Sequence, residues 1–272
     1  MSVVDVWIQH PTARFAAQPF FASLLRWTGR ETLSELPLEH TLEAMDAAGV
    51  DQALLAAWHG PQGALISNDE VAACMAAAPG RLYGLAGVDL TRPLHAVREL
   101  RRRVREQHFK GLRIVPWLWG LPPDDRRYYP LYAECCELDV PFCTQVGHTG
   151  PLLSSEPGRP IPYLEHVALE FPELRIVAGH VGAPWTAEAI SLAHKFPNVY
   201  LDSSAYKLSR LPADFAAYLQ ASGAKKVLFG SNYPMLTPGA CLEGLDALAL
   251  DASARARFLA DNARSVFRLP AP

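Results

Sequence analysis

The chain has 272 residues, half of them hydrophobic, and a formal net charge of −3 at pH 7. This length suits one large α/β barrel, since barrels of about 250 residues fold as single units. The charge balance gives no indication of a nucleic-acid ligand, and no apolar run is long enough to span a bilayer. Five cysteines without CxxC spacing and an N-terminus without signal-peptide features lead us to expect a cytoplasmic protein.

Eight short apolar runs are predicted as strands, and segments with helical patterns separate them. The runs are nearly continuous in apolar character, as in parallel strands buried on both faces. They cover Val3–Ile8, Gln52–Ala57, Leu82–Val88, Gly111–Val115, Val140–Val146, Leu174–Ala178, Val199–Leu201 and Lys226–Phe229. Eight such units favour a (β/α)8 TIM barrel over an open doubly wound sheet, and no composition break divides residues 1–272 into two domains.

The segments between the strands contain recognisable helix signals. Residues 67–70 form a capping-box pattern before an alanine-rich helix that ends at Pro79-Gly80. A last helix is predicted from Asp251 to Phe267. Residues 10–37 instead form a long, aromatic-rich insertion after the first strand. In a barrel, this insertion lies on the face where loops build the active site, so we expect a lid, a homodimer contact, or both.

Two short motifs place a histidine between glycines at the carboxyl end of a predicted strand. They are Gly147-His148-Thr149-Gly150 and Gly179-His180-Val181-Gly182. Histidine exchanges protons near neutral pH, and the neighbouring glycine allows close approach of the backbone to a ligand. Because the carboxyl ends of barrel strands meet at one face, we expect His148 and His180 to act as general acid and base, in an order left open.

Other strand ends add polar and aromatic groups to this predicted site. Arg113 is the leading candidate to bind a carboxylate, with Arg126 and Arg127 as alternatives in the following loop. Asn232 cannot titrate, so its expected task is to orient water or to polarise a carbonyl. The expected substrate-binding residues are Trp7, Gln9, Trp58, His59, Arg113, Trp117 and Tyr206.

Four motifs together resemble the amidohydrolase-2 family, in its aminocarboxymuconate-semialdehyde decarboxylase-like branch. They are Gly-His-Thr-Gly-Pro at 147–151, Gly-His-Val-Gly-Ala-Pro-Trp at 179–185, Gly-Ser-Asn-Tyr-Pro-Met at 230–235 and Asp-Asn-Ala at 261–263. The resemblance runs from Val4 to Phe267. It implies a TIM barrel, usually with one divalent metal, that hydrolyses or non-oxidatively decarboxylates small carboxylated substrates.

The metal-ligand positions that the resemblance implies are largely altered. Trp7 and Gln9 stand where the family has histidines, and Asn232 stands where it has an aspartate, so His148 alone is retained. His180 matches an acid/base or substrate-binding histidine. Indole has no free lone pair and amides are poor zinc ligands, so we expect a site without a metal.

A rebuilt site for Zn or Mn is the alternative cofactor hypothesis. It would use His10 and His148, with His59 as a further candidate, if the strand bulged near Pro11. A structural, hydrogen-bonded histidine is the competing interpretation for both His10 and His59.

The expected function is that of an enzyme with histidine acid/base chemistry. It would be a hydrolase of an activated ester, lactone or thioester, or a non-oxidative decarboxylase, acting on a small carboxylated, cyclic or aromatic substrate. The competing hypothesis is a catalytically inactive barrel that binds such a carboxylated ligand. A general acid and base would be needed only by the enzyme.

Overall fold

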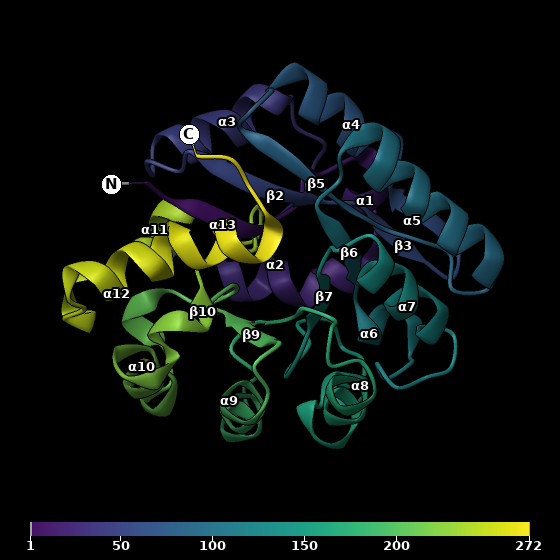
Figure 1. Ribbon diagram of the computed structural model, residues 1–272. Helices are drawn as coiled ribbons and strands as arrows, with labels where there is room; N and C mark the ends of the chain where they lie inside the picture. Colours follow the sequence, from purple (N-terminus) through teal and green to yellow (C-terminus); the bar gives the residue numbers. More distant parts are fainter. Residues whose placement is uncertain (1, 272) are drawn as a thin grey trace.

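The computed structural model describes residues 2–271. Eight parallel strands form its main sheet. Helices surround this sheet (Figure 1). In order around the sheet, the strands are β1 (Val4–Ile8), β2 (Gln52–Ala56), β5 (Leu82–Ala86), β6 (Gly111–Ile114), β7 (Phe142–Gln145), β8 (Ile176–Gly179), β9 (Val199–Asp202) and β10 (Val227–Leu228). Val6 N donates to Phe229 O, and Asn232 N donates to Trp7 O, which nearly closes the barrel. The predicted TIM barrel and its eight strands are confirmed.

Helices follow the barrel strands and cover their outer faces. They are α3 (Leu38–Asp46), α4 (Asn68–Ala77), α5 (Pro93–Gln107), α6 (Pro116–Trp119), α7 (Tyr129–Glu137), α8 (Glu165–Glu170), α9 (Thr186–Lys195), α10 (Ala213–Gln220), α11 (Pro238–Leu242), α12 (Ala252–Ala256) and α13 (Asn262–Phe267). The predicted capping box before α4 is present, since the Ser67 hydroxyl accepts from Glu70 N and the Glu70 carboxylate accepts from Ser67 N. No helix within residues 2–271 has the length and apolarity needed to cross a membrane.

A short antiparallel hairpin follows β2 and departs from the predicted pattern. Its strands are β3 (Trp58–Gly60) and β4 (Gly63–Ile66). Both strands are short, and the connecting Pro61-Gln62 lacks the Asn-Gly or Asp-Gly signal of tight hairpin turns, so the hairpin was not predicted. The hairpin sets Trp58 and His59 on a rigid segment just beyond the barrel.

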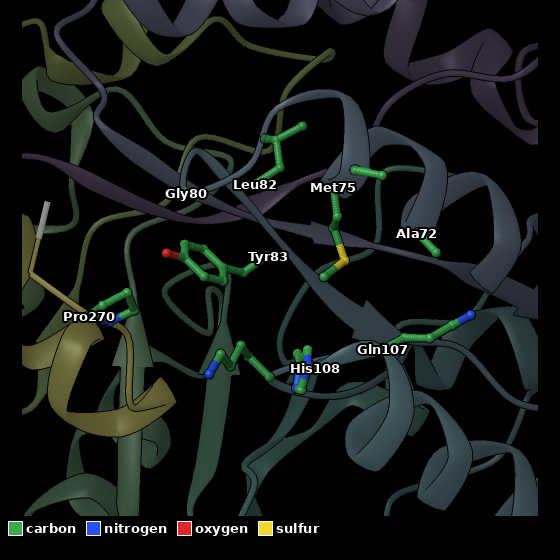
Figure 2. A pocket seen from close by; sticks show the side chains of 10 residues that line it. Ala72, Met75, Gly80, Leu82, Tyr83, Gln107, His108 and Pro270 are labelled. Atoms are coloured by element: carbon green, nitrogen blue, oxygen red, sulfur yellow. The ribbon is translucent and has the colours of Figure 1, made fainter.

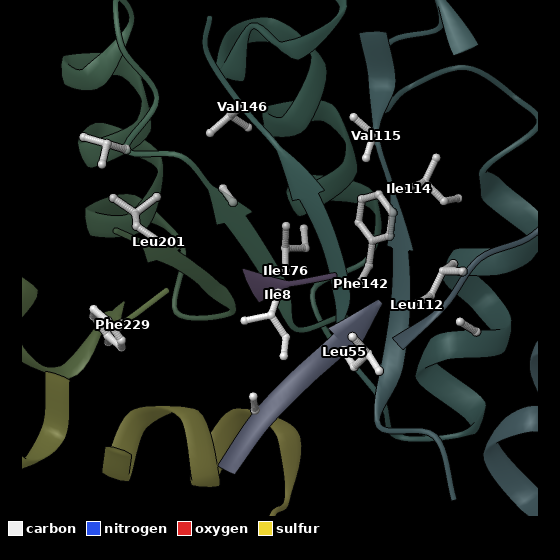
Figure 3. Close-up of a cluster of buried hydrophobic side chains, with 14 of the residues drawn as sticks. Ile8, Leu55, Leu112, Ile114, Val115, Phe142, Val146, Ile176, Leu201 and Phe229 are labelled. Carbon is white, nitrogen blue, oxygen red and sulfur yellow. The ribbon is translucent and has the colours of Figure 1, made fainter. Parts of the chain in front are cut away.

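Alternate residues of the strands belong to two different hydrophobic clusters. The larger cluster joins strand residues to the surrounding helices and includes Leu55, Leu112, Phe142, Ile176 and Leu201 (Figure 3). Their chain neighbours Leu54, Cys143 and Val177 point away from the surrounding helices, into the barrel, and belong to a smaller cluster. Successive side chains of a strand point to opposite faces. Arg113 and Asp202, which follow Leu112 and Leu201, therefore point into the barrel.

The insertion after β1 lies across the carboxyl ends of the strands. It contains α1 (Ala13–Ala16), the turn Pro19–Phe21 and α2 (Ala22–Thr28). Ser23 Oγ donates to Gly150 O at 2.7 Å, and Arg30 Nη1 donates to Pro234 O at 2.6 Å. These bonds attach the insertion to the loops after β7 and β10, so it covers the barrel mouth.

Candidate active site

A buried hydrogen-bond network joins the end of β1, strand β6 and the loop after β10. Arg113 Nη2 donates to Gln9 Oε1 at 3.0 Å, and Gln9 Nε2 donates to Asn232 Oδ1 at 3.0 Å. The same amide nitrogen also donates to Tyr233 O. Only 3% of the Arg113 surface is exposed, and its Nε and Nη1 have no acceptor within residues 2–271. Three residues predicted for the site, Gln9, Arg113 and Asn232, therefore lie in one network.

The Arg113 guanidinium is a cation that has been removed from water. Burial lowers the pKa of Arg113 to about 9, and the nearby carboxylates of Asp202 and Asp5 oppose that shift. The Arg113 Cζ atom lies 4.3 Å from the ring centroid of Trp7 and 5.8 Å from that of Trp58. The π faces stabilise the charge, but they do not satisfy the free N–H groups. The arrangement is suited to binding an anion.

His180 is the buried histidine of the site and begins a chain of hydrogen bonds. Its Nδ1 lies 2.6 Å from Ser204 Oγ, which in turn bonds to Asp202 Oδ1. The imidazole ring also packs against Trp7, with 4.7 Å between centroids. Burial, reinforced by the charge of Arg113, lowers the pKa of His180 to about 3. The ring is therefore neutral at physiological pH.

Asp202 completes this chain inside the barrel. Burial raises the pKa of Asp202, although its hydrogen bonds with Ser204 and His180 N and the charge of Arg113 act in the opposite direction. Its second oxygen, Oδ2, is buried without a partner in the described part of the chain. Neither Asp202 nor Ser204 was among the residues predicted for the site. The two-residue alternation of an extended chain would have placed Ser204 on the same face as Asp202.

Two of the site residues have a left-handed backbone. The φ angles of His180 and Asn232 are both 72°, a region that costs energy for residues other than glycine. Asp202 Oδ1 accepts from His180 N at 3.2 Å, and Trp7 O accepts from Asn232 N at 2.8 Å. These bonds hold the strained segments in place, so the orientation of both side chains is fixed by the barrel.

His148 has different surroundings from His180. Its side chain is exposed, and its ring stacks on Trp27 of α2, with 5.6 Å between centroids and 22° between planes. The two histidine loops nevertheless touch, because His148 N donates to Ala183 O at 2.6 Å. His148 therefore lies at the rim beneath the insertion, while His180 lies in the barrel.

The aromatic residues predicted for the site differ in how deeply they are buried. Trp58 and Trp117 are buried with 6.0 Å between their centroids, and Trp117 Nε1 donates to Gln145 Oε1 at 2.8 Å. Tyr206 is half-buried after β9. His59 stacks on Trp119, with 6.1 Å between centroids, and its Nδ1 lies 3.0 Å from Gly60 O.

Of the alternative arginines, Arg126 is exposed, and Arg127 lies 3.9 Å from Asp125 in the same loop. Neither residue joins the buried network around Arg113.

The donor groups of this site do not fit a divalent metal. Within residues 2–271, no group of three or more His, Cys, Asp or Glu side chains is arranged to hold an ion. His10 Nδ1 bonds instead to Thr41 Oγ1 at 2.8 Å. The alternative ligand set of His10, His148 and His59 is therefore not assembled. The positive charge of Arg113 beside Gln9 would also repel a second cation.

An open pocket of about 480 Å3 lies at the other end of the barrel (Figure 2). Leu82 and Tyr83, at the start of β5, form part of its wall together with Met75, His108 and Pro270. The amino-terminal ends of barrel strands serve stability rather than chemistry. We therefore place the site at the covered, carboxyl-terminal end.

The comparisons with known proteins agree with this geometry. The Amidohydrolase family model matches residues 32–269. The chain belongs to the amidohydrolase family. The resemblance inferred from the four sequence motifs is thus confirmed. Among the relatives of this amidohydrolase, gamma-resorcylate decarboxylase of Rhodococcus jostii (strain RHA1) is 27% identical over 254 aligned positions, and the match covers 75% of each chain.

Solved structures share the fold over nearly the whole chain. An uncharacterized TIM-barrel protein from Bordetella bronchiseptica has a TM-score of 0.85 and 26% identity, and the match covers 99% of each chain. A dihydroxybenzoic acid decarboxylase from Polaromonas sp. JS666, crystallised with manganese and the inhibitor 2-nitroresorcinol, has a TM-score of 0.73 and 19% identity. That match covers 100% of this chain and 98% of the other.

Proposed function

We propose that this amidohydrolase is a non-oxidative decarboxylase of a small aromatic carboxylate that carries a hydroxyl group beside the carboxylate. The observation that carries the proposal is the buried Arg113 cation, with two nitrogens free to donate, next to the hydrogen-bonded His180. The relative named gamma-resorcylate decarboxylase supports the reaction type.

Arg113 is the proposed binding group for the substrate carboxylate. Its Nε and Nη1 would donate to the carboxylate oxygens, while Nη2 stays bonded to Gln9. Charge-assisted bonds of this kind are strong when water is excluded. The buried rings of Trp58 and Trp117 offer apolar walls for an aromatic ring.

His180 is the proposed proton donor to the ring carbon that bears the carboxylate. Ser204 Oγ donates to Asp202 Oδ1, so the Nδ1–H of the neutral imidazole donates to Ser204 Oγ and Nε2 is free to act on the substrate. Nε2 would take the proton of the hydroxyl beside the carboxylate and deliver it to the ring carbon, which leaves a carbonyl in place of the hydroxyl. The carbon–carbon bond then breaks, its electron pair restores the aromatic ring as a phenolate, and CO2 leaves. The phenolate takes a proton from water, and His180 ends the cycle neutral.

The cover over the barrel mouth decides how substrate enters. Trp7 and Gln9 are each 1% exposed, so the network around Arg113 is covered while the insertion is in place. The insertion is attached through Ser23 and Arg30 to loops of the site. We propose that these contacts open to admit substrate and re-form over it, which keeps water away from the reacting carbon.

The test is a panel of ortho-hydroxylated benzoates, beginning with 2,6-dihydroxybenzoate. CO2 release and the matching arene would be measured together by headspace analysis and chromatography, and ligand binding would be measured by calorimetry. We expect equal amounts of CO2 and arene, and loss of both in His180→Gln.

Two outcomes would contradict the proposed reaction. Benzoates that bind without any turnover would point to the inactive binding barrel. Turnover of a lactone or thioester, with none of any benzoate, would point to the hydrolase.

A further inference from the structure

We infer that the Arg113 guanidinium takes the place of the divalent metal found in decarboxylases of this fold. In this chain, the charge that holds the anion would be built into the protein, and the same charge would exclude a metal. The inference rests on the proposed function only for the identity of the anion. It concerns how the site obtains its positive charge.

The two amides at the strand ends use their oxygens as hydrogen-bond acceptors. Gln9 Oε1 accepts from Arg113 Nη2 at 3.0 Å, and Asn232 Oδ1 accepts from Gln9 Nε2 at 3.0 Å. Amide oxygens are the only atoms with which these two side chains could coordinate a cation. Both oxygens are already oriented toward N–H donors, and the network ends on a guanidinium instead of a metal.

Trp7 packs closely against two glycines of the neighbouring strand ends. A Cβ atom on Gly179 would lie 2.5 Å from Trp7 Cζ3, and one on Gly230 would lie 3.2 Å from Trp7 Cβ. The absence of a side chain at Gly179 therefore makes room for the indole, while Gly230 lies close to the Trp7 Cβ atom. The indole provides no lone pair to a metal, but its π face lies 4.3 Å from the Arg113 Cζ atom.

The Arg113 guanidinium has hydrogen-bond donors that no described residue satisfies. Arg113 is almost fully buried, yet Nε and Nη1 have no acceptor among the described residues. The charges of Asp202 and Asp5 raise the pKa of Arg113, but neither carboxylate forms an ion pair with Arg113 within 4 Å in that part of the chain. A buried cation with free donors is unfavourable until an anion satisfies it. The structure thus leaves open the coordination that a substrate carboxylate would complete.

The direct test is calorimetric titration of chelator-treated protein with 2,6-dihydroxybenzoate. We expect the same Kd with EDTA and with added Mn2+. Arg113→Lys should weaken binding by about tenfold or more, because the planar donor set is lost. Arg127→Lys is the matched control and should leave the Kd unchanged. Gln9→Glu, which places a carboxylate against the guanidinium, should weaken the anion by about tenfold as well.

The reciprocal test asks whether Arg113 keeps metal out. The triple variant Trp7→His, Gln9→His, Asn232→Asp would be compared with a quadruple variant that adds Arg113→Ala. We expect the quadruple variant to bind Mn2+ at least about tenfold more tightly than the triple variant, since like charges repel in a buried site. Equal affinities would contradict the inference. If either variant fails to fold, Mn2+ titration of the wild-type protein decides, and stoichiometric binding there would overturn the inference.

The two proposals fail in different ways. Metal-independent binding of the benzoate without CO2 release would support the role of Arg113 and contradict the proposed decarboxylase activity. Decarboxylation that requires added Mn2+, with benzoate binding lost in EDTA, would support the decarboxylase activity and contradict the proposed role of Arg113.

Discussion

The loops that carry His148 and His180 look alike in sequence and differ in physical environment. Both have the pattern Gly-His-x-Gly after a barrel strand, and a backbone hydrogen bond joins them. The His148 ring is exposed and stacks on Trp27 of the insertion. The His180 ring is buried against Trp7 and bonds to Ser204.

The shared motif sets the backbone path of the two loops, whereas the neighbouring residues set the chemistry of each histidine. Gly147 and Gly182, with φ angles of 83° and 81°, allow both loops to turn sharply at the barrel mouth. Burial and the charge of Arg113 then keep His180 neutral. We therefore propose that His180 handles the proton and that His148 helps to hold the insertion.

The largest expected effect separates the two histidines. His180→Gln should lower kcat by about 10²–10⁴-fold, because the proton donor is lost. His148→Gln should lower kcat by less than about tenfold, since its ring contacts the insertion rather than the buried pocket. Steady-state kinetics on the benzoate that turns over fastest would measure both. Equal losses in the two variants would contradict this division of roles.

A smaller effect is expected from breaking the chain behind His180. Ser204→Ala should lower kcat by about 10–100-fold with little change in KM, because the hydrogen bond that orients the His180 ring is lost. Ser204→Thr keeps the hydroxyl and should restore most of the rate. A Ser204→Ala variant with normal kcat would show that the hydrogen bonds orient nothing that the reaction needs.

The buried histidine should also make stability depend on pH. The folded-state pKa of His180 is about 3, below its ordinary value of 6.5, so the unfolded chain binds more protons between these values. The contribution of His180 is present above pH 6.5 and is lost as pH falls toward 3. At pH 5 the loss amounts to about 2 kcal/mol.

Urea denaturation at pH 7.5 and pH 5 would test this linkage. His180→Gln should lose less stability between the two pH values than the wild type, by about that 2 kcal/mol. His148→Gln is the matched control, because its ring is exposed, and it should follow the wild type. If His180→Gln loses as much stability between pH 7.5 and pH 5 as the wild type does, groups other than His180 cause that loss.

The smallest effect is expected at the rim. Trp27→Ala removes the ring that stacks on His148 and should raise KM by less than about tenfold, with kcat preserved, because a rim contact is worth about 1 kcal/mol. Stopped-flow measurement of ligand entry would show faster opening of the insertion. A large fall in kcat would place Trp27 and His148 closer to the chemistry than we propose.

Much of the fold could be predicted because its signals are local. Continuous apolar runs such as Gln52–Ala57 give buried parallel strands, and the Ser67 capping box gives the start of α4. The hairpin β3–β4 could not be predicted, since its strands are short and its register depends on packing against the insertion.

The site could be predicted as a set of residues but not as an arrangement. Gln9, Arg113 and Asn232 were identified from strand ends, yet the bond between Gln9 and Arg113 joins residues 104 positions apart. The contrast between His148 and His180 depends on Trp27 and Trp7, which also come from distant segments. Sequence patterns place such groups at one end of a barrel, and only packing decides which are buried.

Protonation of the ring carbon by His180 can be followed by turnover of an ortho-hydroxylated benzoate in D2O and NMR of the product. We predict release of CO2 and an arene with one deuterium at the carbon that carried the carboxylate. The reason is that the proton that His180 delivers to that carbon exchanges with solvent. Benzoates that bind to the protein by calorimetry but yield neither CO2 nor deuterated arene would contradict the account.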